Sequence, residues 1–91
     1  MDEKVIERIA KALSDRNRLL ILQKIANTGC VGCEQVSEVV ALAQPSVSHH
    51  LKVLVDAGLI RSDKTGRHVN LSLNKDKLQE FIDYLNQLKN K

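Results

Sequence analysis

Aromatic side chains are almost absent from this sequence. Its 91 residues include one Phe, one Tyr and no Trp. Proteins that bind RNA or single-stranded DNA by stacking bases need aromatic platforms, so the composition argues against RNA as a partner. The hydrophobic residues, 43% of the chain, must therefore build an aliphatic core, which favours packed helices.

Long hydrophobic runs are absent as well. Stretches such as Leu19–Leu22 are far shorter than the roughly 20 residues that a membrane-spanning helix needs. The start, Met1-Asp-Glu-Lys, mixes both signs of charge and does not resemble a secretory signal, so we expect a cytoplasmic protein with no membrane partner. In that compartment the two cysteines are expected to be free, redox-active or metal-binding, and not joined in a structural disulfide.

The charge balance is mildly basic, with a formal net charge of +3 and a pI near 9.0. This balance permits binding to nucleic acid without demanding it. A chain of 91 residues is expected to form a single domain, residues 1–91. A domain of this size often gains stability by oligomerising.

Helical periodicity covers the first part of the chain. Apolar residues three and four apart predict a helix over 2–13. Ser14 or Asp15 can cap a second helix over about 15–27, which Gly29 ends. The apolar face of this second helix is predicted to carry Leu19, Leu22, Ile25 and Ala26. A short helix over about 33–40 follows, and 41–43 is predicted to be a tight turn.

The next helix, over about 44–57, has two different faces. Pro45 suits its first turn, and Gly58 suits the left-handed residue that follows its end. One face is apolar and carries Val47, Leu51, Leu54 and Val55. The other face carries Ser46, His49, Lys52 and Asp56, with Gln44 at the tip. Its hydroxyl, amide, imidazole and ammonium groups can bond to base edges and phosphates. Taken alone, this polar face could equally be a solvated surface.

A β-hairpin comes next, with strands over 59–63 and 68–73 joined by a polar turn at Lys64-Thr-Gly-Arg67. A short helix, a turn, a helix with an exposed polar face and a basic-tipped hairpin together predict a winged helix-turn-helix. The fold class is therefore mainly α with a small β-hairpin. The exposed helix fits the major groove, and the wing can reach phosphates or the minor groove.

A last helix is predicted over about 75–89, with Asn74 as its cap. It carries a continuous apolar stripe of Leu78, Phe81, Ile82, Leu85 and Leu88. The core of so small a domain has little room for the apolar faces of both the first and the last helix. We therefore expect these two helices to form the interface of a homodimer. The alternative is that they complete the core of a monomer.

Four segments together resemble the ArsR/SmtB family of metal-responsive bacterial repressors. They are Ser14-Asp-Arg-Asn-Arg-Leu-Leu-Ile-Leu22, Gln44-Pro-Ser-Val-Ser-His-His-Leu-Lys-Val-Leu54, Ala57-Gly-Leu-Ile60 and Gly66-Arg67. The resemblance spans nearly the whole chain. It implies a dimeric repressor, not an enzyme, that binds an operator in double-stranded DNA and releases it when an inducer arrives. With two recognition helices per dimer, the operator is expected to be an inverted repeat.

The resemblance also implies roles for single residues. The positions that face the DNA groove correspond to Gln44, Ser46, Ser48 and His49. Ser48 lies beside the apolar stripe, which favours a phosphate contact, and His50 lies nearer the core, which favours a packed or interhelical role. Other phosphate contacts are expected from Lys52, Lys64, Arg67, His68 and Arg16. Arg18 is open between a backbone contact and an ion pair with Asp15.

Cys30 and Cys33 are the candidate sensing residues. Family sensors of arsenic, cadmium or lead keep a Cys-x-Cys pair that would fall at residues 32 and 34, which are Gly32 and Glu34 here. Two thiols do not complete a tetrahedral site, so a soft metal or metalloid would need a third donor from outside. Close to a helix start, Cys33 is expected to have a lowered pKa, which favours redox or persulfide chemistry. The third possibility is that neither cysteine meets an inducer.

The family's other metal site, for zinc or cobalt, uses carboxylates and histidines on the last helix. Residues 75–89 contain Asp76, Glu80 and Asp83 but no histidine, so no site of that kind is expected. Two other classes of function remain open: a winged helix that docks only protein, and a thiol oxidoreductase. The βαβ context that a redox Cys-x-x-Cys needs is missing, which argues against the oxidoreductase.

Overall fold

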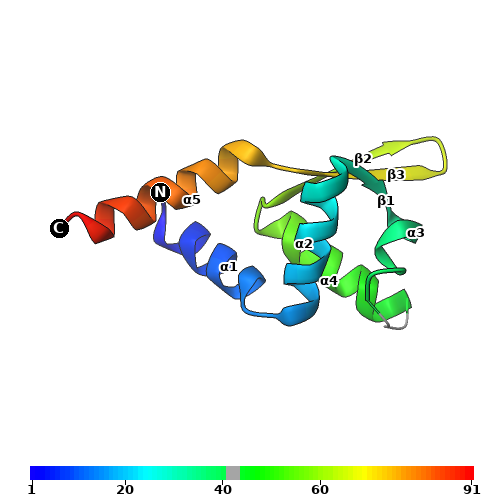
Figure 1. Ribbon diagram of the computed structural model, residues 1–91, viewed down its shortest axis with the longest axis horizontal. Coiled ribbons are helices and arrows are strands. Elements are labelled where there is room, and N and C mark those ends of the chain that lie inside the picture. The colour runs from blue at the N-terminus through cyan, green and yellow to red at the C-terminus, as the bar shows by residue number, and fades with distance from the viewer. Residues whose placement is uncertain (41–43) are drawn as a thin grey trace.

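The elements follow the predicted chain order, with one added strand. The computed structural model describes residues 1–40 and 44–91, and the predicted turn at 41–43 lies outside them. The elements are α1 (Glu3–Leu13), α2 (Arg16–Thr28), β1 (Cys30–Gly32), α3 (Cys33–Val36), α4 (Gln44–Asp56), β2 (Ile60–Thr65), β3 (His68–Leu73) and α5 (Lys75–Lys89). Figure 1 shows α2 and α4 crossing in the body, with the wing at one end and α5 projecting at the other.

Helix starts are fixed by side-chain caps that local sequence predicted. The Asp15 carboxylate accepts a hydrogen bond of 3.0 Å from the backbone N–H of Arg18 and so caps α2. Asn74 caps α5 in the same way, accepting from the backbone N–H of Lys77 at 3.2 Å. Of the two candidates for the cap of α2, the structure uses Asp15, while Ser14 ends α1; the predicted cap Asn74 is confirmed.

The end of α4 is closed by Gly58, whose φ of 78° lies in the left-handed region. The N–H of Gly58 donates to the carbonyl of Val55 at 2.9 Å, and the N–H of Leu59 donates to the carbonyl of Leu54 at 3.1 Å. These two bonds make a Schellman motif, which turns the chain directly from α4 into β2.

The core lies between α1, α2, α4 and one face of the sheet. Its fully buried side chains include Ile9, Ala12, Ile21, Ile25, Val36, Val47, Leu54 and Leu59. The apolar face predicted for α2 is rotated around the helix relative to the face that is buried in the structure. Helix α2 buries Ile21, whereas Leu19, which was predicted to be buried, is 41% exposed. Since α2 packs against α1 and α4 on one side and the sheet on another, its buried face is set by those neighbours.

Val55 corrects the predicted apolar stripe of α4. It is 38% exposed, whereas Val47 and Leu54 are fully buried. At 100° per residue, Val55 lies about 80° around the helix from Val47. That angle turns it out of the core toward the space between α4 and the hairpin.

The sheet has three strands within the described residues, in the order β1-β3-β2. Strand β1 was not predicted. It pairs antiparallel with β3 and places Val31 opposite Leu71, both 1% exposed. The helix expected over 33–40 is correspondingly shorter and ends at Val36. The β-branched residues that follow, Val39 and Val40, have low helix propensity, and residues 37–39 form turns instead.

The hairpin is longer and its turn tighter than predicted. Its last paired residues are Thr65 and His68, so the turn consists of Gly66 and Arg67. Gly66 has a φ of 61° and no described non-glycine residue has a positive φ, which matches a type II′ turn with glycine in its first central position. The tip of the wing is therefore set by a two-residue turn.

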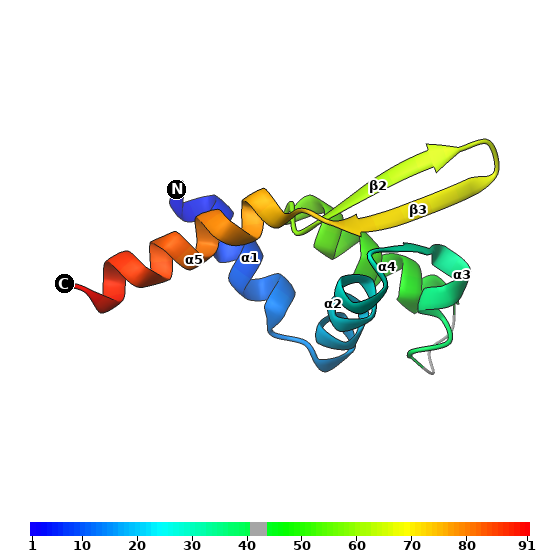
Figure 2. The ribbon, with the colours of Figure 1, turned by 45° about the horizontal axis from the view of Figure 1, so that its top comes forward.

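Helix α5 extends away from the body. Figures 1 and 2 show it running past α1, with both chain ends on this side and the wing at the opposite end. The molecule is accordingly elongated, at 46 × 24 × 22 Å. None of the 15 residues of α5, all of them described, is buried. Among the described helices, none is long and apolar enough to cross a membrane.

Candidate nucleic-acid interface

The outer face of α4 presents a row of polar side chains to solvent. Ser46, Ser48, His49 and Lys52 are all exposed, as their predicted roles require. Gln44 begins the helix, and its side chain lies outside the described part of the structure. Val47, Leu51 and Leu54 hold the opposite face in the core. The helix is thus anchored on one side and offers hydroxyl, imidazole and ammonium groups on the other.

His50 belongs to a junction of three helices, which confirms its interhelical role. Its Nδ1 lies 3.1 Å from Nη1 of Arg18 and 3.8 Å from a carboxylate oxygen of Asp15. Because a guanidinium only donates, Nδ1 of His50 must accept in this bond, which assigns the ring proton to Nε2. The junction therefore fixes how α4 sits on α2.

Arg18 extends the same junction to the end of α1. Its Nε donates to the carbonyl oxygen of Ala12 at 2.8 Å, and its Nη2 donates to that of Lys11 at 3.0 Å. Both carbonyls belong to the last turn of α1; that of Lys11 also accepts from the N–H and the hydroxyl of Ser14, and a cation there suits the helix dipole. Arg18 is a structural residue, and the pattern Asp-Arg-Asn-Arg gave no sign of this bond to α4.

Asp15 gains electrostatically from the junction. The hydrogen bond from the backbone N–H of Arg18 is the largest influence on this carboxyl and holds its pKa below the usual value; desolvation by burial opposes it, and the charge of the Arg18 side chain adds to it. Asp15 therefore stays ionised as it caps α2 beside the imidazole of His50.

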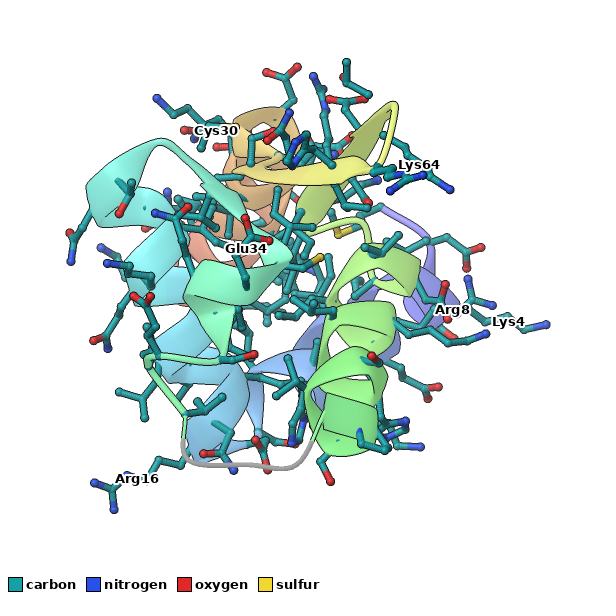
Figure 3. All side chains as sticks on the ribbon, turned by 90° about the vertical axis from the view of Figure 1, so that its right-hand side faces the viewer. Lys4, Arg8, Arg16, Cys30, Glu34 and Lys64 are labelled. Atoms are coloured by element: carbon teal, nitrogen blue, oxygen red, sulfur yellow. The ribbon has the colours of Figure 1, made fainter. Side chains whose placement is uncertain are left out.

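The wing carries Lys64, Arg67 and His68, all exposed. Lys64 pairs across the hairpin with Val69, two residues from the Ser62–Leu71 pair. Since alternate residues share a face, Lys64 lies on the side of the hairpin that faces the helices. Figure 3 shows Lys64 on the same side of the molecule as the outer face of α4.

Arg16 has a different position from the other predicted contacts. It is exposed at the start of α2. Figure 3 shows it on the opposite side of the molecule from Lys64 and the outer face of α4. Its contact with a DNA backbone stays a prediction, and the α4 and wing contacts form a group without it.

A shallow hollow of about 300 Å³ separates α4 from the hairpin. Its lining residues are Cys33, Ser48, Leu51, Lys52, Val55, Ser62, Val69 and Leu71. The exposed Val55 side chain is one wall of this hollow. This hollow is thus bordered both by Cys33, a candidate sensing residue, and by Ser48 and Lys52, which were predicted to contact DNA.

The two cysteines point to opposite sides of the sheet. Cys30 is exposed and stands opposite Ser72, on the face away from the buried pair Val31 and Leu71. Cys33 packs against the core and lines the hollow on the helix side. No disulfide joins them, both thiols being free. Within the described residues there is also no group of three or more His, Cys, Asp or Glu side chains that could hold a metal ion.

The pKa of Cys33 moves in the opposite direction from the predicted one. Burial, and then the charge of Glu34, raise the pKa of this thiol above its usual value. Helix α3 has only four residues, so its dipole is too short to offset these effects. A reactive thiolate at Cys33 is therefore disfavoured at neutral pH.

One basic group was missed in the sequence. Helix α1 carries Lys4, Arg8 and Lys11, all exposed, at i, i+4 and i+7. This spacing, visible in the sequence, puts them on one face of the helix. Figure 3 shows Lys4 and Arg8 on the same side of the molecule as Lys64.

Comparison with known proteins defines the class. A family model described as a helix-turn-helix domain matches residues 13–63. The arsenical resistance operon repressor of Staphylococcus xylosus is 38% identical over 87 residues, which is 96% of this chain and 79% of that protein. The transcriptional repressor SdpR of Bacillus subtilis is 31% identical over 86 residues, which is 94% of both chains.

Solved structures show the same fold. The crystal structure of an ArsR family transcriptional regulator superposes with a TM-score of 0.90 at 23% identity, covering 99% of this chain and 92% of that one. The chain belongs to the ArsR/SmtB family of winged helix-turn-helix repressors. It is a DNA-binding transcriptional regulator, not an enzyme.

Proposed function

We propose that the protein acts as a homodimer on an inverted-repeat operator, which each protomer reads through α4 and its wing. The observation that carries this proposal is the exposed row on α4, Ser46, Ser48, His49 and Lys52, beside a hairpin whose Lys64 faces the same side. Ser46 and His49 read base edges together with Gln44. Ser48 and Lys52 bind phosphates and set the register of the helix in the major groove.

The wing supplies contacts that do not depend on sequence. Arg67 lies in the two-residue turn, His68 follows it directly, and Lys64 lies two residues before it; all three are exposed. Each phosphate that such a cation neutralises releases condensed counterions, so it adds about 0.9 to the slope of log affinity against log salt.

In the proposed dimer, a second copy of the chain covers the projecting part of α5. Ile82, Leu85 and Leu88 are 48%, 47% and 49% exposed. A row of large apolar side chains on a helix outside the body costs free energy in water, and a two-fold partner removes that cost. The DNA-binding domain of a possible ArsR-family regulator from Mycobacterium bovis, which has the same fold at a TM-score of 0.74, is homodimeric. The two recognition helices would lie about 34–36 Å apart.

The test is selection of bound duplexes from a genomic or random library, followed by titration of the selected site by fluorescence anisotropy. His49→Ala is expected to lose about 1–3 kcal/mol of discrimination at one base pair of each half-site. Arg67→Gln is expected to weaken selected and unselected duplexes equally and to lower the salt slope by about two units per dimer. The control is Lys75→Gln, an exposed charge at the start of α5 near Ala26 of α2 and Gly29, which follows that helix.

Failure of the wild-type chain to bind any duplex with measurable salt dependence would refute operator binding. It would favour a winged helix that docks protein. Sedimentation of the wild type and of Leu85→Lys tests the dimer separately, because the charged side chain should leave a folded monomer that binds single half-sites only weakly.

We further propose that the release signal acts on the thiols. Cys30 is exposed, so a peroxide or persulfide reaches it first, while Cys33 borders the hollow beside Ser48 and Lys52. Peroxide would oxidise the Cys30 thiol to a sulfenic acid with release of water, and the Cys33 thiol would then displace the hydroxyl as a second water to form a disulfide. This bond would draw β1 away from β3, because Cys30 lies on the outer face of the sheet and Cys33 on the helix side. Loss of β1 would free the segment that leads into α3 and the helix-turn-helix. A thiophilic metal or metalloid is the alternative signal, and it needs a donor from another molecule.

Release from DNA is measured separately with peroxide, persulfide, arsenite and cadmium. The Cys30→Ser and Cys33→Ser variants serve as controls. Loss of the response in one or both variants is expected. A response that both variants retain would remove the cysteines from the mechanism, whichever reagent caused it.

A further inference from the structure

We propose that the DNA interface continues from α4 onto α1, where Lys4, Arg8 and Lys11 bind phosphates between the two half-sites. This inference rests on the proposed operator binding and adds a surface to it. The partner is the sugar–phosphate backbone of duplex DNA, and these contacts carry no sequence information.

The three cations form a stripe along α1. At 100° per residue they fall within about 60° of arc around the helix. All three are exposed, whereas Ile9, about 100° around the helix from Arg8, is fully buried; Ala12, only about 40° from Arg8, is buried too and marks the edge of the stripe. The buried face fixes the rotation of α1, so the direction of the stripe is set by the core.

The stripe and the recognition helix face the same way. Figure 3 shows Lys4 and Arg8 on the side of the molecule to which the outer face of α4 and Lys64 also turn. Helices α1 and α4 pack directly against each other. A straight or gently bent duplex bound to α4 would therefore run next to this side of α1.

Carboxylates do not neutralise the stripe. Glu3 and Glu7, the acidic residues of α1, line a hollow with Ile6 of the same helix and Tyr84 of α5. Both border α5 through this hollow, although Glu7 also lies about 60° around the helix from Lys4 and about 40° from Lys11. Within the described part of the chain, the salt bridges involve other residues and leave these three cations unpaired.

The position along the molecule indicates which part of the operator is contacted. Figures 1 and 2 show α1 between the α4–wing body and the projecting end of α5. The proposed two-fold partner lies at that end, so the stripe is nearer to the dyad than α4 is. Phosphates near the centre of the operator are its expected contacts.

The experiment uses the double variant Lys4→Gln/Arg8→Gln in the full chain. Lys11 is left unchanged because its residue belongs to the Arg18 junction. Affinity is measured by fluorescence anisotropy from 50 to 300 mM KCl on the selected operator and on a scrambled duplex. With four fewer phosphate contacts per dimer, the salt slope should fall by about 3 to 4 units, and both duplexes should weaken by the same factor.

The matched control, Lys75→Gln/Lys91→Gln, removes two exposed charges at sites outside the stripe. Its salt slope should match that of the wild type, and an equal fall in the control would show a net-charge effect and overturn the inference. A second arm replaces the central phosphates of the operator by uncharged methylphosphonates. This should lower the slope of the wild type and leave that of the α1 variant unchanged.

Two results distinguish this inference from the function on which it rests. If Lys4→Gln/Arg8→Gln keeps the wild-type slope while Arg67→Gln lowers it, α1 does not contact DNA although the protein binds its operator. If the wild type itself binds no duplex, operator binding is wrong as well. Circular dichroism and sedimentation of each variant exclude unfolding and loss of the dimer as causes.

Discussion

Replacement of Arg18 by Met should destabilise the protein although Arg18 is partly exposed. The guanidinium makes three bonds, to the carbonyls of Lys11 and Ala12 and to Nδ1 of His50, at 3.0, 2.8 and 3.1 Å. Met keeps most of the aliphatic stem and the helix propensity of the residue. The substitution therefore isolates the polar junction of α1, α2 and α4.

The structure sets the size of the effect. The carbonyl of Lys11 also accepts from Oγ of Ser14 at 2.7 Å and from its N–H at 3.1 Å, so it keeps partners in the variant. Ala12 and His50 lose theirs. Each lost bond should cost about 1.5 kcal/mol, the low end for a charged donor, because water can enter this partly exposed site. For the two bonds together, the free energy of unfolding should fall by about 3 kcal/mol.

Urea denaturation of a double-mutant cycle measures this effect at one fixed protein concentration. The cycle compares Arg18→Met, His50→Leu and the double variant with the wild type. Their coupling should be about 1–1.5 kcal/mol, because the 3.1 Å bond is lost in either single variant. Arg18→Lys should recover less than half of the loss, since an ammonium cannot match the fork of the guanidinium. Additive effects within about 0.3 kcal/mol, or a total cost below 0.5 kcal/mol, would refute the junction.

Three further outcomes follow from the site. The pKa of Asp15 is lowered in the folded state, so its contribution to stability is present above the ordinary value of 3.8 and is lost as the pH falls through the folded value. The variant Asp15→Asn still caps α2 but lacks this titration. Its stability, followed by circular dichroism, should therefore depend less on pH in the acid range. At pH 7.5, maleimide should label Cys30 faster than Cys33, because burial raises the pKa of the Cys33 thiol. Mass spectrometry should show that the difference between the two labelling rates becomes smaller at higher pH. Gly66→Ala should cost about 1 kcal/mol, because its φ of 61° strains any residue with a Cβ, and should weaken binding to all duplexes alike.

Features that depend on neighbours in sequence were predictable. The caps Asp15 and Asn74 and the closing residue Gly58 follow local rules that operate within one helical turn. Exposure of the polar side of α4 follows from its 3.6-residue period in the same way. The order of the elements could therefore be predicted from the sequence, and so could the row of groups offered to DNA.

Features that depend on distant residues were not predictable. The three residues of β1 are extended because Val31 pairs with Leu71, some 40 positions away. The same pairing places the two thiols on opposite sides of the sheet and partly buries Cys33. This burial raises the pKa of Cys33, whereas the sequence predicted that it would be lowered. Likewise, Val55 lies about 80° around the helix from Val47, and whether a side chain at that angle is covered depends on how closely the hairpin approaches α4.

Net charge was the least informative property of the sequence, because it does not show where the charges lie. The value of +3 sums cations such as Lys4, Arg8 and Lys64, which share one side of the molecule (Figure 3), with carboxylates of α1 and α5 and with Asp56 and Asp63, which are exposed on α4 and β2. Glu3 and Glu7 line one hollow between α1 and α5, and Glu80 and Asp83 line another. Basic residues of α1, α4 and the wing face away from both. Such a separation gives a duplex one attractive face to approach, so association should be orientated and strongly dependent on salt even though the sum is small.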